Sequence, residues 1–311
     1  MWTRSVLKEN AKNNLRGKYW TAFAVALIVR ILGSGSSGWG VSGTGWKMDS
    51  NQGDWDFFNS QWLLIIILII IVVFILAMAF TIFVSNLVTV GGNRWFSRNR
   101  ESAATPSVGM VFSLFKSGSY LKTAGSMLWM ELFLFLWSLL PLIPLIAGAA
   151  VLAGVPGLTE EIYNLFRQQD FDRFKNWLAS LEPGLTLSLS VLPLLSALLS
   201  IPYIIKSYSY RMTPWILADN PQIGYRRALR LSMKMTRGSK WTMFVLDLSF
   251  LGWRILGALA CGIGVLFVTP YIMATHAELY ATLRQYSVAA GSCTMEELGF
   301  IPVNPQMPQT F

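Results

Sequence analysis

The chain has 311 residues, of which 53% are aliphatic, aromatic or sulfur-containing and only 13% are charged. A soluble domain carries about 25% charged residues, so this composition excludes an ordinary soluble globular protein and favours a membrane protein. The net charge of +9 could suggest a nucleic-acid-binding protein. We expect no nucleic-acid partner, because the basic residues lie beside the apolar segments, where they meet anionic lipid headgroups first.

Few residues of this chain suggest catalysis or metal binding. Cys261, Cys293 and the single histidine, His276, form neither a disulfide framework nor a Cys/His metal cluster. The Gly-Ile-Gly run at 262–264 lacks the third glycine and the strand–helix context of a dinucleotide site. No serine or cysteine stands in a nucleophile arrangement. We therefore expect no cofactor, no metal and no catalytic residue, and a protein that is not an enzyme.

Residues 1–18 predict a basic amphipathic helix, because basic and apolar residues recur side by side every four positions. The basic stripe consists of Arg4, Lys8, Lys12 and Arg16. The apolar stripe consists of Leu7, Ala11 and Leu15. Residues 19–32 then predict a short apolar helix with Arg30 near its outer end. The alternative is a cleaved signal peptide, although no A-x-A cleavage site follows this helix.

Three apolar segments in the first two thirds of the chain predict membrane spans. Residues 62–90 form the clearest one, since they exceed the about 20 residues that a spanning helix needs. Residues 124–145 and 185–205 are also apolar, and each contains two prolines. The segment 33–61 is rich in Gly, Ser, Asp and Trp and predicts an irregular outer loop. A surface helix is expected over 159–181.

A basic segment precedes the last apolar stretch. Asp219-Asn220-Pro221 predicts a helix start, with Pro221 at the first helical position. The apolar face of this helix would consist of Gly224, Ala228, Leu231 and Met235. The basic residues beside or opposite that face are Arg226, Arg227, Arg230 and Lys234. Gly238 is expected to end the helix, which we place on the anionic inner leaflet.

Residues 241–283 are mostly apolar and about twice as long as one span. They predict two helices, 241–260 and 265–284, joined by a tight turn that contains Gly262 and Gly264. One long tilted helix is the alternative. The sequence therefore predicts an all-α, polytopic membrane protein of about six transmembrane helices in three hairpins, with amphipathic helices in the cytoplasm.

The orientation follows from the distribution of Lys and Arg. Six spans place both termini on one side, together with the segments 1–18, 91–123, 206–240 and 284–311. These four segments hold most of the Lys and Arg residues of the chain. The positive-inside rule then puts both termini in the cytoplasm. The localisation we expect is the bacterial cytoplasmic membrane.

A short motif occurs twice. Residues 16–23 read RGKYWTAF and residues 237–244 read RGSKWTMF, and a weaker third copy begins at Gly118. The copies predict a single membrane domain, 1–290, with three units, about 1–90, 107–205 and 219–285, followed by a flexible cytoplasmic tail, 291–311. The alternative is that any helix starting at the inner face favours Gly, Trp and Lys.

Four stretches carry a resemblance to a known family. They are Asp219-Asn220-Pro221, the ALRLS run at 228–232, the LDLSFLGW run at 246–253 and Pro270-Tyr271. With the N-terminal LRGKYW run at 15–20, they make the chain similar to the bacterial integral-membrane proteins grouped as domain of unknown function 975. The resemblance implies a six-helix-like protein of the bacterial cytoplasmic membrane. It implies no activity and carries over no functional residues, and the loop at 33–61 is the part that it covers least.

Ionisable residues inside apolar segments are the candidate polar site. Asp247 and Glu278 lie at equal depth in the predicted hairpin, and Glu131 lies at a similar depth in another span, roughly 10 Å inside the inner face at about 1.5 Å per residue. These carboxylates could form a shared cation or proton site, or each could reach interface water. His276 could titrate near neutrality or serve as a hydrogen-bonded structural residue. Arg254 could pair with Asp247 or meet water.

The sequence leaves two functions open. The first is a non-enzymatic membrane protein that transports a small or amphipathic compound, or assists its export across the envelope. The second is a scaffold or partner subunit that binds anionic lipid or another membrane protein through its basic helices. The expected partners are the lipid bilayer and its anionic headgroups, with a membrane-protein partner or a homo-oligomer as further possibilities.

Overall fold

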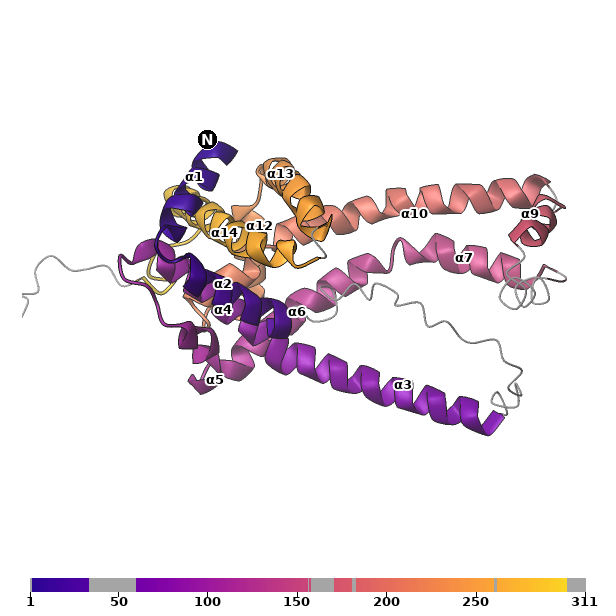
Figure 1. Cartoon of the computed structure of the whole chain (residues 1–311), viewed down its shortest axis with the longest axis horizontal. Helices are drawn as coiled ribbons and strands as arrows, with labels where there is room; N and C mark the ends of the chain where they lie inside the picture. The colour runs from indigo at the N-terminus through magenta and orange to yellow at the C-terminus, as the bar shows by residue number, and fades with distance from the viewer. Residues whose placement is uncertain are drawn as a thin grey trace, which may run out of the picture. The chain divides into compact units, whose positions relative to one another are not determined.

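The computed structural model describes residues 2–33, 60–155, 157, 171–180, 183–259 and 262–300. Across these residues the protein is all-helical and contains no strand, which confirms the predicted fold class at that level. The chain packs as two compact units, Met1–Met130 with Ser209–Phe311, and Glu131–Tyr208. The first and last thirds of the sequence therefore fold together (Figure 1). Most of the predicted outer loop and most of the predicted surface helix lie outside the described residues.

The larger unit contains most of the helices. They are α1 (Arg4–Leu15), α2 (Tyr19–Ile28), η1 (Val29–Gly33), α3 (Ser60–Phe80), η3 (Thr81–Ser85), α4 (Asn86–Glu101), η4 (Val108–Phe112), α5 (Ser113–Lys116), α11 (Thr213–Asp219), α12 (Tyr225–Met235), α13 (Lys240–Leu259) and α14 (Gly264–Ala289). The smaller unit contains α7 (Leu142–Ala153), α9 (Phe171–Ser180) and most of α10 (Pro183–Tyr210). Helix α6 (Tyr120–Ser138) begins in the larger unit and ends in the smaller one.

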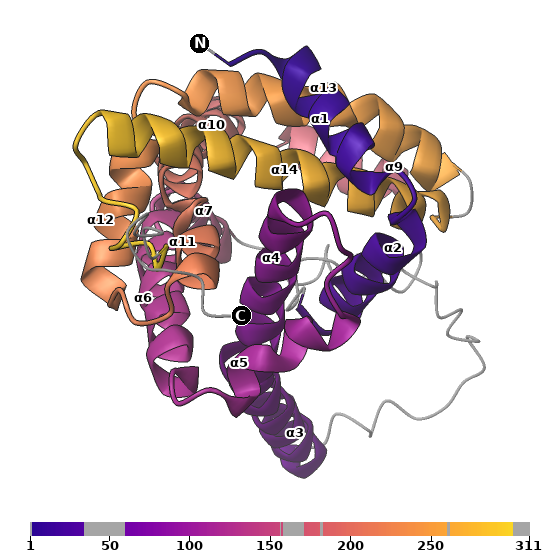
Figure 2. The same ribbon diagram turned by 90° about the vertical axis from the view of Figure 1, so that its left-hand side faces the viewer.

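Helices α4 and α14 form the centre of the larger unit. α14 packs against α1, α2, α4, α12 and α13, and α4 also packs against α11 and η4 (Figure 2). The close approach of η4 depends on Gly91, because a Cβ there would lie 1.9 Å from the carbonyl oxygen of Val111. Trp95, Phe96 and Tyr280 are among the largest fully buried side chains of this core.

Three helices are long and apolar enough to cross a membrane, namely Leu64–Glu101, Pro183–Asp219 and Lys240–Leu259. The pair Tyr120–Ser138 and Leu142–Val151, bent by 45°, would make a fourth span. Along α3 the side chains from Leu64 to Phe80 are mostly exposed, an apolar surface far larger than soluble proteins show and one that lipid would cover. The described chain therefore holds three or four candidate spans, which indicates a membrane protein.

The two helices predicted over 241–260 and 265–284 are confirmed as α13 and α14, and the turn between them contains Gly262 with a φ of +76°. α14 is long enough to cross a bilayer, but its second half carries Glu278 and Arg284 and is buried in the unit. In Figure 2 α13 and α14 run across the view, whereas α3 is strongly foreshortened.

The predicted helix start at Asp219 is wrong. Asp219 is the last residue of α11, and α12 begins only after Gly224, which has a φ of +83°. The side chain of Asn220 accepts a hydrogen bond from the amide of Gln222 at 2.8 Å and forms a turn. The predicted apolar face of the basic helix is confirmed at Ala228, Leu231 and Met235, which are buried together with Leu229 and Ser232, whereas Gly224 lies before the helix.

Residues 291–300, where the predicted flexible tail begins, pack against the larger unit. Leu298 is fully buried, and Cys293 is a buried free thiol. Glu297 accepts hydrogen bonds from Arg227 on α12, at 2.5 and 2.8 Å. Residues 301–311 lie outside the described part of the chain.

Candidate functional site

A cavity of about 440 Å³ lies between α1, α2, α13 and α14. The residues that line it are Lys12, Leu15, Arg16, Tyr19, Trp253, Phe267, Val268 and Tyr271. We call this cavity the basic-rimmed groove. Its volume falls within the roughly 300–1,000 Å³ that is usual for small-molecule sites. Two distant parts of the sequence form it, so it exists only in the folded protein.

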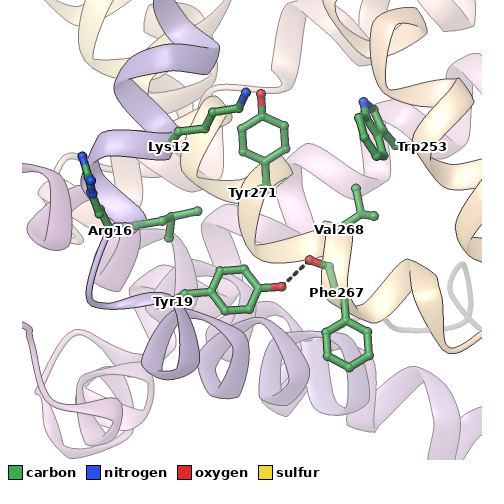
Figure 3. A pocket seen from close by; sticks show the side chains of 8 residues that line it. Lys12, Arg16, Tyr19, Trp253, Phe267, Val268 and Tyr271 are labelled. Carbon is green, nitrogen blue, oxygen red and sulfur yellow. Dashed lines mark hydrogen bonds between the residues drawn. The ribbon is translucent and has the colours of Figure 1, made fainter.

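The wall from α1 and α2 is set by a glycine turn. Gly17 has a φ of +76°, a conformation that favours glycine. The turn at Gly17 lets α2 begin at Tyr19, soon after α1 ends at Leu15. Arg16 and Tyr19 therefore reach the same groove. The Tyr19 hydroxyl donates a hydrogen bond to the carbonyl oxygen of Phe267 at 2.7 Å, which ties α2 to α14 (Figure 3).

The opposite wall depends on the close approach of α13 and α14. A Cβ at Gly257 would lie 2.7 Å from the amide nitrogen of Val265, so this contact requires glycine. Trp253 lies one helical turn before Gly257 and so enters the groove from α13. Trp253 and Phe267 are 56% and 46% exposed, so much apolar surface remains uncovered.

The groove is apolar with a basic rim. None of its eight lining residues is acidic. Figure 3 shows the polar ends of Lys12, Tyr271 and Trp253 along one edge, with the Phe267 ring at the opposite edge. Such an arrangement suits a molecule with one anionic end and one apolar end.

α1 is held on the hairpin by a cation–π contact. The ammonium nitrogen of Lys8 lies 4.5 Å from the centroid of the Phe250 ring on α13. Burial lowers the pKa of this lysine, and the nearby charges of Arg4 and Lys12 lower it further. Leu7, on the apolar stripe of α1, is almost fully buried. The basic stripe therefore contributes both a docking contact and the rim of the groove.

Asp247 belongs to an ion-pair cluster that joins three helical segments. Arg211, between α10 and α11, donates to both carboxylate oxygens of Asp247, one of them at 2.9 Å. Nε2 of His276 on α14 lies 3.3 Å from the same carboxylate and 3.0 Å from Arg211. The interpretation of His276 as a hydrogen-bonded structural residue fits this geometry. Arg254, the other predicted partner, is exposed.

Glu278 has different partners. Its side chain is 4% exposed, and its carboxylate lies 3.0 Å from Nε of Arg100, while Nδ2 of Asn14 donates to it at 2.5 Å. These three residues, together with Asn10 and Asn13, line a second cavity of about 240 Å³. The structure therefore assigns Asp247 and Glu278 to separate clusters. Glu131, the third predicted acid, belongs to the smaller unit.

A third cluster was missed by the sequence analysis. Arg284 on α14 pairs with Asp219 at 2.9 Å and with Glu101 at 2.7 Å. The Tyr280 hydroxyl donates to the same Asp219 oxygen at 2.7 Å, and the Arg284 guanidinium lies 4.2 Å from the Phe300 ring centroid. Tyr280 and Arg284 lie one turn apart on the buried face of α14. The signal that could have found this cluster is an arginine on a mostly apolar helical stripe, since a buried arginine needs acidic partners.

The family whose description is protein of unknown function (DUF975) matches residues 1–287. The chain belongs to the DUF975 family. This confirms the resemblance that the sequence motifs carried. No curated protein and no solved structure matches the chain. The DUF975 match covers every residue of the basic-rimmed groove and of the Asp247 and Glu278 clusters. It ends before Phe300 and Glu297.

The predicted lipid-facing basic residues of this DUF975 protein are mostly exposed. The exposed ones are Arg4, Lys12, Arg16, Arg226, Arg230 and Lys234, whereas Lys8 and Arg227 are partly buried. Arg227 pairs with Glu297, so it is not available to lipid in the same way. Among the described residues no group of three or more His, Cys, Asp or Glu residues could hold a metal ion.

Proposed function

We propose that the protein is a non-enzymatic, multi-pass protein of the bacterial cytoplasmic membrane that binds a small amphipathic compound and assists its transport or export. The observation that carries this proposal is the basic-rimmed groove, which combines apolar walls with the cations of Lys12 and Arg16. The exposed apolar helices support the membrane location. The compound would reach the groove from the bilayer, where amphipathic molecules concentrate.

The topology we propose has an even number of crossings and both termini in the cytoplasm. Six crossings follow if the α13–α14 hairpin spans the bilayer, as the sequence predicts. Four follow if the hairpin does not cross the bilayer, since the second half of α14 carries Glu278 and Arg284 and is buried in the unit. Labelling of Cys261 with a membrane-impermeant maleimide in intact cells separates the two, because only six crossings place this residue outside. Cys293 is buried and offers little background.

We also propose that the chain contains an internal repeat, and the backbone geometry of three turns supports it. In each turn the residue after the glycine accepts a hydrogen bond from the amide four positions on. These amides belong to Ala22, Thr123 and Met243, and all three residues are fully buried. The residues two positions before them are Trp20, Leu121 and Trp241, and their exposures are 72%, 70% and 73%. The middle turn departs in one respect, since Gly118 lacks the positive φ of Gly17 and Gly238.

A flux assay on a variant whose groove is blocked by a larger side chain tests the function. The purified full-length chain is reconstituted into liposomes, and transfer of a dansyl-labelled medium-chain fatty acid across the bilayer is measured. Val268→Trp places a bulky ring in the groove and should abolish most protein-dependent flux. Val72→Trp, on the exposed surface of α3, is the matched control and should leave the flux unchanged. Equal flux in both variants would refute the proposal.

A scaffold or partner subunit is the second candidate, and α12 favours it. Arg226, Arg230 and Lys234 on this helix are exposed, whereas its apolar face is already buried in the unit. A surface helix with exposed cations suits anionic lipid or an acidic membrane-protein partner. Purification of the chain with one stoichiometric partner, lost on charge reversal of these residues, would support this candidate.

A further inference from the structure

We propose that the natural occupant of the basic-rimmed groove is an anionic phospholipid of the bilayer. Its phosphate would lie at the rim to which Lys12 and Arg16 contribute, and one acyl chain would lie along Phe267 and Val268. The inference rests on the proposed function, because it names the class of compound that the same groove holds.

The first argument is the state of the two cations. Among the described residues neither Lys12 nor Arg16 makes an ion pair, and both are exposed. Other arginines near α14 have carboxylate partners, as Arg211, Arg100 and Arg284 do. The rim of the groove is therefore a place where an unneutralised positive charge meets an apolar cavity. A phosphodiester group brings the complementary charge.

The second argument is the apolar wall. Leu15, Phe267, Val268 and the ring of Tyr19 offer a surface with no acidic group, and Phe267 and Trp253 are about half exposed. Covering apolar surface is favourable by roughly 25 cal/mol per Å². An acyl chain would cover this wall, whereas a small soluble anion such as free phosphate would leave it open.

The third argument is the place of the groove in the chain. It lies where the basic helix α1 passes into the apolar helix α2. Where an interfacial helix is followed by a span, this junction lies at the depth of the lipid headgroups. Tyr19, Tyr271 and Trp253 line the groove, and Tyr and Trp are the residues that favour this depth. Trp20, which follows Tyr19 in the sequence, is 72% exposed and suits the same interface.

Fluorescence quenching in nanodiscs tests the proposal with the full-length chain. Discs contain increasing fractions of phosphatidylglycerol or phosphatidylcholine brominated on the acyl chains. The difference in quenching between the wild type and Trp253→Phe isolates the signal of the groove. We expect brominated phosphatidylglycerol to quench this signal at a lower mole fraction than brominated phosphatidylcholine.

The preference should depend on the two rim cations. The double variant Lys12→Gln, Arg16→Gln should weaken it by about fivefold for each charge removed. A matched control, Lys116→Gln with Arg237→Gln, removes the same charges from exposed sites outside the groove and should keep the preference. A charge-conserving exchange, Lys12→Arg with Arg16→Lys, should also keep it, which shows that the two positive charges rather than the particular side chains set the preference.

The outcomes separate this inference from the proposed function. Equal quenching by the two phospholipids, unchanged in the double variant, would overturn the anionic phospholipid. Quenching by a brominated fatty acid without quenching by phosphatidylglycerol would overturn it too and would assign the groove to free amphiphiles, while the proposed function would stand. Absence of quenching by every amphiphile, together with unaltered flux in Val268→Trp, would overturn both.

Discussion

Replacing Arg284 with methionine should destabilise the larger unit more than any exposed charge substitution. Methionine keeps the apolar stem but leaves the Asp219 carboxylate, whose side chain is 3% exposed, without its cation. Glu101 loses its 2.7 Å partner at the same time. Removing one member of a buried ion pair costs about 3–5 kcal/mol, because the remaining charge stays buried and uncompensated.

The assay is denaturant unfolding of the detergent-solubilised chain, from which the free energy of unfolding is obtained. Arg226→Met is the control, since Arg226 is exposed and its loss should change stability by about 0.5 kcal/mol or less. Adding Asp219→Leu to Arg284→Met should recover part of the loss, because the double variant no longer buries a lone carboxylate at this position. A loss below about 1 kcal/mol in Arg284→Met, or no recovery in the double variant, would refute the reasoning.

Two further predictions concern other parts of the larger unit. Gly91→Ala should destabilise by about 1–3 kcal/mol, because its Cβ would lie 1.9 Å from the Val111 carbonyl oxygen, whereas Gly125→Ala, with nothing within 4 Å, should be neutral or stabilising in the same unfolding assay. Hydrogen bonds from Arg227 lower the pKa of Glu297 from its usual 4.5, so this pair stabilises the fold above that pH and its contribution disappears as the pH falls through the lowered pKa. Glu297→Gln should therefore cost about 0.2–1 kcal/mol at pH 7 and nothing at strongly acidic pH, and a constant difference from pH 7 down to pH 2 would contradict this.

Local patterns in the sequence predicted several helices and their buried faces. The four-residue spacing of Leu7, Ala11 and Leu15 predicted the buried stripe of α1, and the structure buries all three. Gly262 predicted the turn between α13 and α14, because a positive φ favours glycine. Such features depend on neighbours along the chain, so they can be read from the sequence.

The helix start predicted at Asp219 shows where local patterns fail. Asp-Asn-Pro is a good capping sequence, but the carboxylate of Asp219 instead accepts hydrogen bonds from Arg284 and Tyr280 across the unit. The same is true of the two acids of the hairpin, whose equal depth in the sequence did not reveal that Arg211 and Arg100 would bind them separately. Long-range partners decide the role of a buried charge.

The sequence by itself determined that the chain is helical and suited to a membrane. It also determined several turns, the apolar stripes of the helices and the basic surface residues. These properties follow from composition and from the period of 3.6 residues in a helix. The tertiary structure alone decided that Lys12 and Arg16 would line one cavity together with Trp253, Phe267 and Tyr271. The folding of the two ends of the chain into one unit creates that cavity, and pairing between residues so far apart has no local signature for a period or a motif to show.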